Sequence, residues 1–138
     1  MGIINEKFVI NTQGDTDIVD ITKHVQNCVY QHEIKDGIVF VSVTGSTSAL
    51  TTIEYEEGLV RDLKEALEKI APTGKEYHHD EIWHDGNGYA HVRSAIVGTS
   101  VSVALVDGLL NLGTWQQIVL LDFDNKPRSR QVTVQIIN

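Results

Sequence analysis

The sequence contains few of the residues that cross-link, stiffen or anchor a chain: 138 residues include one cysteine and two prolines. Because Cys28 has no cysteine partner in the chain, the fold cannot depend on an internal disulfide. No apolar run is long enough to span a bilayer, and no Pro-rich linker divides the chain. With 41% hydrophobic residues, the sequence predicts one domain over residues 1–138, held by an ordinary core.

Positive charge is also scarce. Eleven lysines and arginines stand against 19 acidic residues, which gives a formal net charge of −8. Binding along a nucleic-acid backbone, or to an anionic membrane surface, needs a basic patch, so we expect neither partner. The opening MGIINEKFVI lacks the charged leader and apolar segment of a signal peptide, and we expect a cytoplasmic protein.

Hydrophobic periodicity predicts a single α+β domain. Ile21, Val25 and Val29 follow helical spacing and place Cys28 toward the core as a small buried hydrophobe, whereas His24 and His32 fit the helix surface. Helices are expected over residues 21–32, 59–70 and 87–97. Strands are expected over residues 7–12, 38–43, 49–55, 77–82, 101–106, 115–123 and 131–137.

Side chains suited to catalysis or ligand binding are concentrated between residues 77 and 117. This run contains four of the six histidines and both tryptophans. His78, His79, His84 and His91 stand there among acidic and amide side chains. Imidazole beside carboxylate is the combination used for proton transfer or for binding a divalent metal. If residues 77–82 form a strand, His78 and His79 point to opposite faces, and only one of them belongs to a site.

The runs DGNGYAHVRSAIVG, DGLLNLGTWQQI and PRSR, preceded by GSTSALTTIEYEEGLVRDL, are similar to the YjbQ-like family of secondary thiamine-phosphate synthases. This resemblance covers essentially the whole chain. It implies an α+β fold with helices packed on a mixed β-sheet, a homotrimer, and histidines that bind a divalent metal. It also implies weak synthesis of thiamine phosphate from a pyrimidine diphosphate and a thiazole phosphate, with release of diphosphate.

The resemblance and the residue types together select the candidate catalytic groups. His79 and His91 match family positions and suit acid–base work or metal ligation. Glu54 could orient a histidine, with an ordinary solvated glutamate as the alternative. Asn87 and Asp85 fit a helix cap and a turn, and the helix start at Asn87 also suits an anion. The candidate metal ligands are His79, His84 and His91 for zinc or magnesium, and no organic cofactor is expected.

Binding of a phosphorylated metabolite needs local positive charge and hydrogen-bond donors. Arg128, presented by Pro127, is the first candidate for the phosphate, whereas Arg130 fits a surface ion pair. Trp115 could stack on a ring or simply fill the core. The full set of candidate substrate-binding residues is Ser46, Thr47, Arg93, Trp115, Gln116 and Arg128.

Two classes of function remain open. One is an enzyme of small phosphorylated metabolites, either a thiamine-phosphate synthase or a metal-assisted phosphohydrolase that uses the same groups. The other is a non-catalytic trimeric protein that binds a metabolite or metal. Ser46 and Tyr89 stand where family members often have histidine, which favours this second class.

Overall fold

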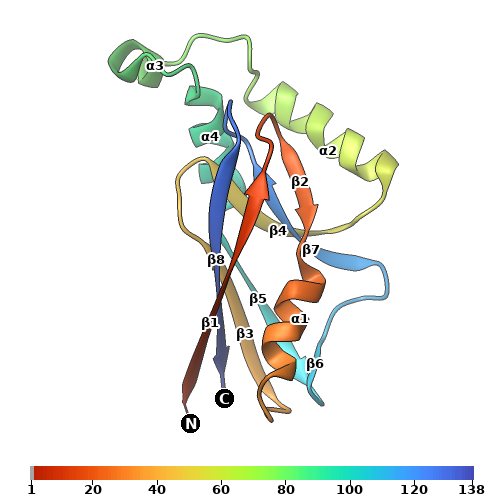
Figure 1. Cartoon of the computed structure of the whole chain (residues 1–138). Coiled ribbons are helices and arrows are strands. Elements are labelled where there is room, and N and C mark those ends of the chain that lie inside the picture. Colours follow the sequence, from red (N-terminus) through yellow and green to blue (C-terminus); the bar gives the residue numbers. More distant parts are fainter. Residues whose placement is uncertain (1) are drawn as a thin grey trace.

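The computed structural model describes residues 2–138, which form two antiparallel β-sheets and four helices (Figure 1). The five-stranded sheet has the order β1-β8-β3-β5-β6, and the three-stranded sheet has the order β2-β7-β4. Their bounds are β1 Ile3–Thr12, β2 Asp17–Asp20, β3 Gly37–Val43, β4 Ser48–Glu54, β5 Ser100–Val106, β6 Leu109–Leu110, β7 Gln116–Asp122 and β8 Arg128–Ile137. The α+β class is confirmed, but every pairing in residues 2–138 is antiparallel and the sheet is not mixed.

The helices gather mainly at one end of the sheets. Helix α1 (Thr22–Tyr30) lies toward the end that carries both termini, whereas α2 (Glu57–Ile70), α3 (His78–Trp83) and α4 (Gly88–Val97) lie at the other end (Figure 1). The three helices expected from the sequence are confirmed. None of the helices in residues 2–138 has the length and apolar character needed to cross a membrane.

The strand expected over residues 77–82 is wrong, because this segment forms α3. Asp80 and Glu81 occupy the first turn of α3, where negative charge interacts favourably with the helix dipole. Strands β2 and β6, four and two residues long, were not expected because neither carries a readable alternation.

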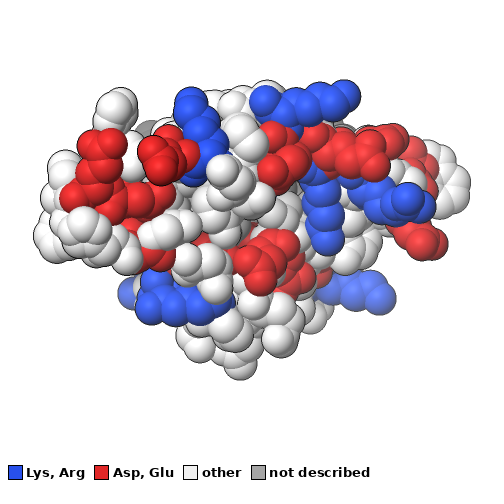
Figure 2. Space-filling view, turned by 90° about the horizontal axis from the view of Figure 1, so that it is seen from above, with Lys and Arg blue, Asp and Glu red and all other residues white. Residues whose placement is uncertain are grey.

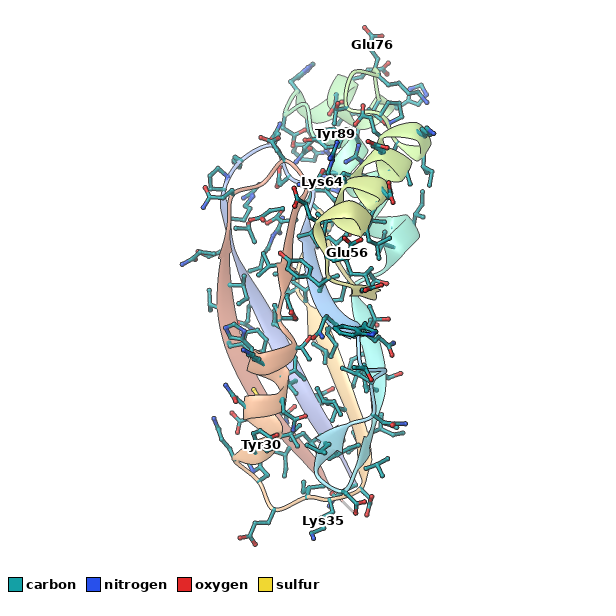
Figure 3. The ribbon with its side chains drawn as sticks, turned by 90° about the vertical axis from the view of Figure 1, so that its right-hand side faces the viewer. Tyr30, Lys35, Glu56, Lys64, Glu76 and Tyr89 are labelled. Atoms are coloured by element: carbon teal, nitrogen blue, oxygen red, sulfur yellow. The ribbon has the colours of Figure 1, made fainter. Side chains whose placement is uncertain are left out.

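Two hydrophobic clusters fix the sheets and helices in place. The larger is aliphatic, and strand alternation supplies much of it: Val132, Val134 and Ile136 of β8 point inward at every second position. Cys28 is buried there, as expected. The smaller cluster joins α2 and α4 to β7 through Leu67, Tyr89 and Leu121. Figure 3 shows Tyr89 near the end of the molecule opposite Tyr30 and Lys35.

Candidate functional site

A polar pocket of about 380 Å³ opens at the end of the sheets where α3 and α4 lie. Three segments far apart in the sequence meet there: the β3–β4 loop, the region from α3 to the first turn of α4, and the β7–β8 turn. Such a junction of loops on a rigid sheet is where binding sites usually form. The lining residues are Gly45, Ser46, Thr47, His79, Trp83, Asp85, Asn87, His91, Asp124, Arg128 and Arg130.

His79 and His91 face each other in this pocket, with their ring centroids 4.2 Å apart. The expected approach of these two histidines is therefore confirmed. Burial, followed by the neighbouring His79, lowers the pKa of His91, so its ring is neutral at pH 7. A neutral imidazole can accept a proton or ligate a metal. His78, by contrast, is almost fully exposed outside the pocket, as expected.

The Nε2 atom of His79 is buried and has no hydrogen-bond partner among residues 2–138. Asp85 Oδ1 lies 3.3 Å from it, close enough for an ionic contact but not aligned for a hydrogen bond. Ligand atoms of His79, Asp80 and Asp85 lie within 4.8 Å of one another. One imidazole and two carboxylates fit the preferences of zinc, so the residues present suit the metal that the resemblance implies.

Two buried carboxylates hold the two arginines of the pocket. Arg130 donates from Nε and Nη2 to the oxygens of Asp122, at 2.7 and 2.8 Å. Arg128 contacts Asp124 Oδ2 from Nε and Nη2, at 2.9 and 2.8 Å. Burial alone would raise the pKa of each aspartate, but these arginines and other hydrogen-bond donors outweigh it and lower both pKa values. Both carboxyl groups are therefore ionised at neutral pH.

One nitrogen of each guanidinium, Nη1, is free to donate to a ligand. Neither Nη1 has a hydrogen-bond partner within residues 2–138. Gly45, with φ of +141°, lies directly against Arg130: a Cβ at this position would come within 2.9 Å of Nη1. The glycine thus leaves the guanidinium edge uncovered.

Asn87 has a fixed orientation. Its Nδ2 donates to Asp124 Oδ1 at 3.3 Å, and because an ionised carboxylate only accepts hydrogen bonds, the amide cannot be reversed. Its Oδ1 is left buried without a partner in residues 2–138. Asn87 stands at the start of α4 as expected, but its side chain makes no capping bond.

The structure brings together Ser46, Thr47, His79, Asn87, His91 and Arg128 from the set chosen on sequence. Glu54, Trp115 and Gln116 lie elsewhere. Glu54 pairs with Gln116 where β4 ends and β7 begins, about 20 Å along the strands from Ser48 and Asp122. These strands reach the pocket with their other ends, so these three residues do not line the pocket of their own chain.

Two further expectations are corrected. His84 ends α3 in a left-handed conformation and lines a groove with Tyr77 and Glu81, so it does not join His79 and His91. Arg93 stands two residues after His91 on α4, and such residues point to different sides of a helix. It is buried against Ala71, Thr16 and Glu68 and does not line the pocket.

Sequence reasoning missed Asp122 and Asp124 and misplaced Arg130, which is buried and not a surface residue. The signal was present in LLDFDN, because two acids closing a buried apolar strand need partners. Trp83 also lines the pocket although it is largely exposed, and the sequence carries no signal for this position.

Comparison with known proteins places the chain in a family. The family model described as "UPF0047 protein YjbQ-like" matches residues 6–138. The chain belongs to the YjbQ-like UPF0047 family. A UPF0047 protein of Archaeoglobus fulgidus is 41% identical over 131 residues, which cover 95% of this chain and 99% of that protein. One from Methanothermobacter thermautotrophicus is 32% identical, over 99% of this chain and 93% of its own length.

Solved structures agree with this assignment. A YbjQ-like protein of unknown function from Sulfolobus solfataricus superposes with a TM-score of 0.94 at 29% identity, covering 99% of this chain and 98% of its own. An uncharacterized conserved protein of the YjbQ/UPF0047 family from Clostridium acetobutylicum gives 0.87 at 33% identity, covering 96% and 99%. The YjbQ-like fold therefore extends over nearly all of residues 2–138.

The surface around the pocket has no single sign of charge. Figure 2 looks down on the end of the YjbQ-like domain that carries α2, α3 and α4, and its basic side chains form separate small groups among acidic ones. Recognition of an anion at this end must therefore come from a few oriented donors within the pocket.

Proposed function

We propose that the pocket binds a phosphorylated small metabolite together with a divalent metal ion and acts on it as an enzyme. The observation that carries the proposal is the convergence of unused polar groups: His79 Nε2 and Asn87 Oδ1 are buried without partners beside His91. A buried polar group costs roughly 1 to 3 kcal/mol when it is left unpaired. A ligand or metal would satisfy these groups.

The arginine edges support phosphate as the charged part of the ligand. Asp122 and Asp124 orient Arg130 and Arg128, leaving each Nη1 to donate to an oxygen. Hydrogen bonds between guanidinium and phosphate are charge-assisted and directional. Ser46 supplies a hydroxyl group in the same pocket, whereas the Thr47 hydroxyl donates to Asp124 and accepts from Arg130.

A metal would supply the positive charge that the paired arginines lack. Arg128 and Arg130 are neutralised by Asp124 and Asp122, so the pocket has little net positive charge at neutral pH. His79 and Asp85, with Asp80 beside them, would hold zinc or magnesium. When bound, such an ion polarises a phosphoryl oxygen and stabilises developing negative charge.

His91 would act as the acid–base group. Its neutral ring can take a proton from an attacking group and return it to a leaving group. Synthesis of thiamine phosphate, with departure of diphosphate, is the first reaction to test, because stabilisation of a departing phosphate suits this pocket better than a nucleophile. A metal-assisted phosphohydrolase would use the same groups, and a non-catalytic metabolite-binding protein would lack the turnover.

Phosphate binding and acid–base catalysis can be separated with Arg128→Ala and His91→Ala. Each variant is assayed by calorimetry with a phosphate ester and by thiamine-phosphate synthase turnover. We expect Arg128→Ala to weaken phosphate binding by about 1.5 to 3 kcal/mol. His91→Ala should abolish turnover and retain phosphate binding. Arg61→Ala, at an exposed position on α2, is the control and should change neither.

Equal loss of binding and turnover in both variants would contradict this division of roles. Absence of turnover in the parent protein, with phosphate binding retained, would favour the binding-protein alternative. Elemental analysis of the purified protein, repeated on His79→Ala, tests the metal: the parent should hold zinc or magnesium, and the variant should lose it.

We also propose a homotrimer, located in the cytoplasm. Ile82, Trp83 and Ile96 are exposed on α3 and α4, and large apolar side chains at the surface suit burial between subunits. Light scattering should give three times the chain mass of 15.3 kDa. A mass equal to that of one chain would contradict the proposed homotrimer. The single cysteine, Cys28, is compatible with a reducing compartment.

A further inference from the structure

The side chain of Asn87 presents a buried oxygen that no described protein group satisfies. Only 5% of Asn87 is exposed, and its Oδ1 has no hydrogen-bond partner among residues 2–138. Asp124 accepts a hydrogen bond from Asn87 Nδ2, and its lowered pKa keeps it ionised at neutral pH. The amide therefore cannot turn its oxygen toward Asp124, and Oδ1 needs a partner from elsewhere.

A phosphate cannot be that partner. A phosphate ester is ionised at neutral pH and offers oxygens that accept hydrogen bonds, and Asn87 Oδ1 is itself an acceptor. The group that meets Oδ1 must be a hydrogen-bond donor or a cation. His79 Nε2, which is also buried without a hydrogen-bond partner in residues 2–138, sets the same requirement when it carries no proton. One divalent cation can accept both lone pairs, whereas hydrogen bonding would need two separate donors.

The β7–β8 turn holds Asn87 and a proposed metal ligand by adjacent residues. Asp124 accepts from the Asn87 amide at 3.3 Å, and the next residue, Asn125, donates from Nδ2 to the main-chain oxygen of Asp85 at 2.8 Å. The amide of Asn125 in turn donates to Asp124 Oδ1 at 2.8 Å, which fixes the turn itself. Asn87 and Asp85 are therefore anchored to the same short segment at the pocket wall.

The close approach of α3 to α4 brings Asp80 to the same place. The amide of Gly88, directly after Asn87, donates to Asp80 Oδ1 at 3.1 Å. A Cβ at Gly88 would come within 2.4 Å of the Tyr77 Cβ, so a glycine permits this contact. The candidate metal cluster to which Asp80 belongs therefore lies next to Asn87.

We propose that Asn87 Oδ1 is a ligand of the divalent ion and that Asp124 is the positioning residue that holds this oxygen in the metal site. This inference rests on the proposed function, which assigns a metal to His79 and Asp85. Carboxamide oxygens are ordinary ligands of divalent cations, and a ligating group is usually oriented by a second residue that does not touch the ion. Asp124 also accepts from Arg128, so one buried carboxylate holds a metal ligand and a phosphate donor.

Binding of Mn²⁺ alone tests the role of Asn87. The protein is freed of metal with a chelator and titrated with Mn²⁺ by calorimetry, without phosphate. Asn87→Ala should weaken Mn²⁺ binding by about tenfold or more. Its free energy of unfolding should stay close to the parental value, because the Asn87 side chain makes no capping bond and Asp124 keeps its other donors. Asn11→Ala, which removes a carboxamide from an exposed position on β1, is the matched control and should retain parental affinity.

Asp124→Asn tests the positioning role, because an asparagine donates as well as accepts and no longer fixes the orientation of the Asn87 amide. Mn²⁺ affinity should fall by about 10- to 100-fold. In the parent protein, Mg²⁺ should shift the nuclear magnetic resonance signal of the Asn87 side-chain carbonyl carbon. In folded Asp124→Asn this shift should be lost, a result that a purely structural role of Asp124 would not produce.

Parental Mn²⁺ affinity in Asn87→Ala, or an Asn87 carbonyl signal that Mg²⁺ leaves unmoved in the parent, would overturn the inference while leaving the metal site at His79 intact. Weaker binding of a phosphate ester by Asn87→Ala, with unchanged Mn²⁺ affinity, would also overturn it and would show that Oδ1 accepts from the organic ligand. Failure of the parent protein to bind Mn²⁺, Mg²⁺ or Zn²⁺ would contradict the metal in the proposed function itself.

Discussion

Two arginine clusters lie at the same end of the molecule, and they differ in how completely protein surrounds the guanidinium. Arg93 donates from Nε, Nη1 and Nη2 to Ala71, Thr16 and Glu68, and its guanidinium lies 5.1 Å from the Tyr89 ring. Arg128 and Arg130 donate from Nε and Nη2 alone. An arginine with every edge occupied joins structural elements, whereas one with an open edge can bind a ligand.

The difference explains why charge type alone is a poor guide to function here. Arg93 connects α4 to the end of α2 and to the β1–β2 connection, and satisfies groups that burial would otherwise leave unpaired. Arg130 satisfies Asp122 in the same way but also reaches the pocket beside Gly45. Arg130 is therefore expected to contribute to both stability and binding. Arg93 is expected to contribute to stability alone, and Arg128 mainly to binding.

The largest effect is expected for Arg130→Met. It leaves Asp122 fully buried without its counter-charge, which should lower the free energy of unfolding by about 3 to 5 kcal/mol in urea titrations. The double variant Asp122→Leu/Arg130→Met should recover part of this loss, because no unpaired charge remains. A double variant less stable than either single variant would mean that packing, and not the charge, dominates this cluster.

Acid should remove part of the same interaction. Because the pKa values of Asp122 and Asp124 are lowered in the folded state, their contribution is present above the ordinary aspartate pKa and is lost as pH falls below about 4. Urea unfolding from pH 7 down to pH 3 should show this decrease, with a shallower decrease in Arg130→Met. Identical pH profiles would show that Arg130 does not cause the lowered pKa.

A smaller loss is expected for Arg93→Met, about 2 kcal/mol, because the Ala71 carbonyl and the Thr16 hydroxyl lose their donor. Glu68 is partly solvated and should add little. Calorimetric unfolding should show the lower melting temperature, and phosphate titration should be unchanged. Weakened phosphate binding in a folded Arg93→Met protein would erase the contrast between the two clusters.

The smallest effect on stability is expected for Arg128→Ala, about 1 kcal/mol or less, since Arg128 is partly exposed. Asp124 also keeps hydrogen bonds from Thr47, Asn87 and the Asn125 amide. Urea titration should therefore show a nearly parental midpoint while phosphate binding falls. A large loss of stability would place Arg128 in the same structural class as Arg93.

Much of the fold was readable from the sequence because periodicity reports burial. The helices over residues 21–32, 59–70 and 87–97 and most long strands were expected correctly. The strand predicted over residues 77–82 is wrong, because six residues with few apolar positions carry no decisive period. Acidic residues in the first turn stabilise a helix there instead. Strand β6, with two residues, had no pattern to read.

The sequence by itself determined an acidic α+β domain and the chemistry of its histidine-rich segment, since hydrophobic spacing and residue type are local properties. It also brought His79 and His91 together correctly, because only a short segment separates them. Tertiary structure alone decided which ends of β4 and β7 meet that segment. It left Glu54 and Trp115 outside the pocket and placed Asp124 and Arg130 in it. The physical reason is strand direction: a strand carries its two ends about 20 Å apart, and only pairing and packing fix which end lies beside a distant loop.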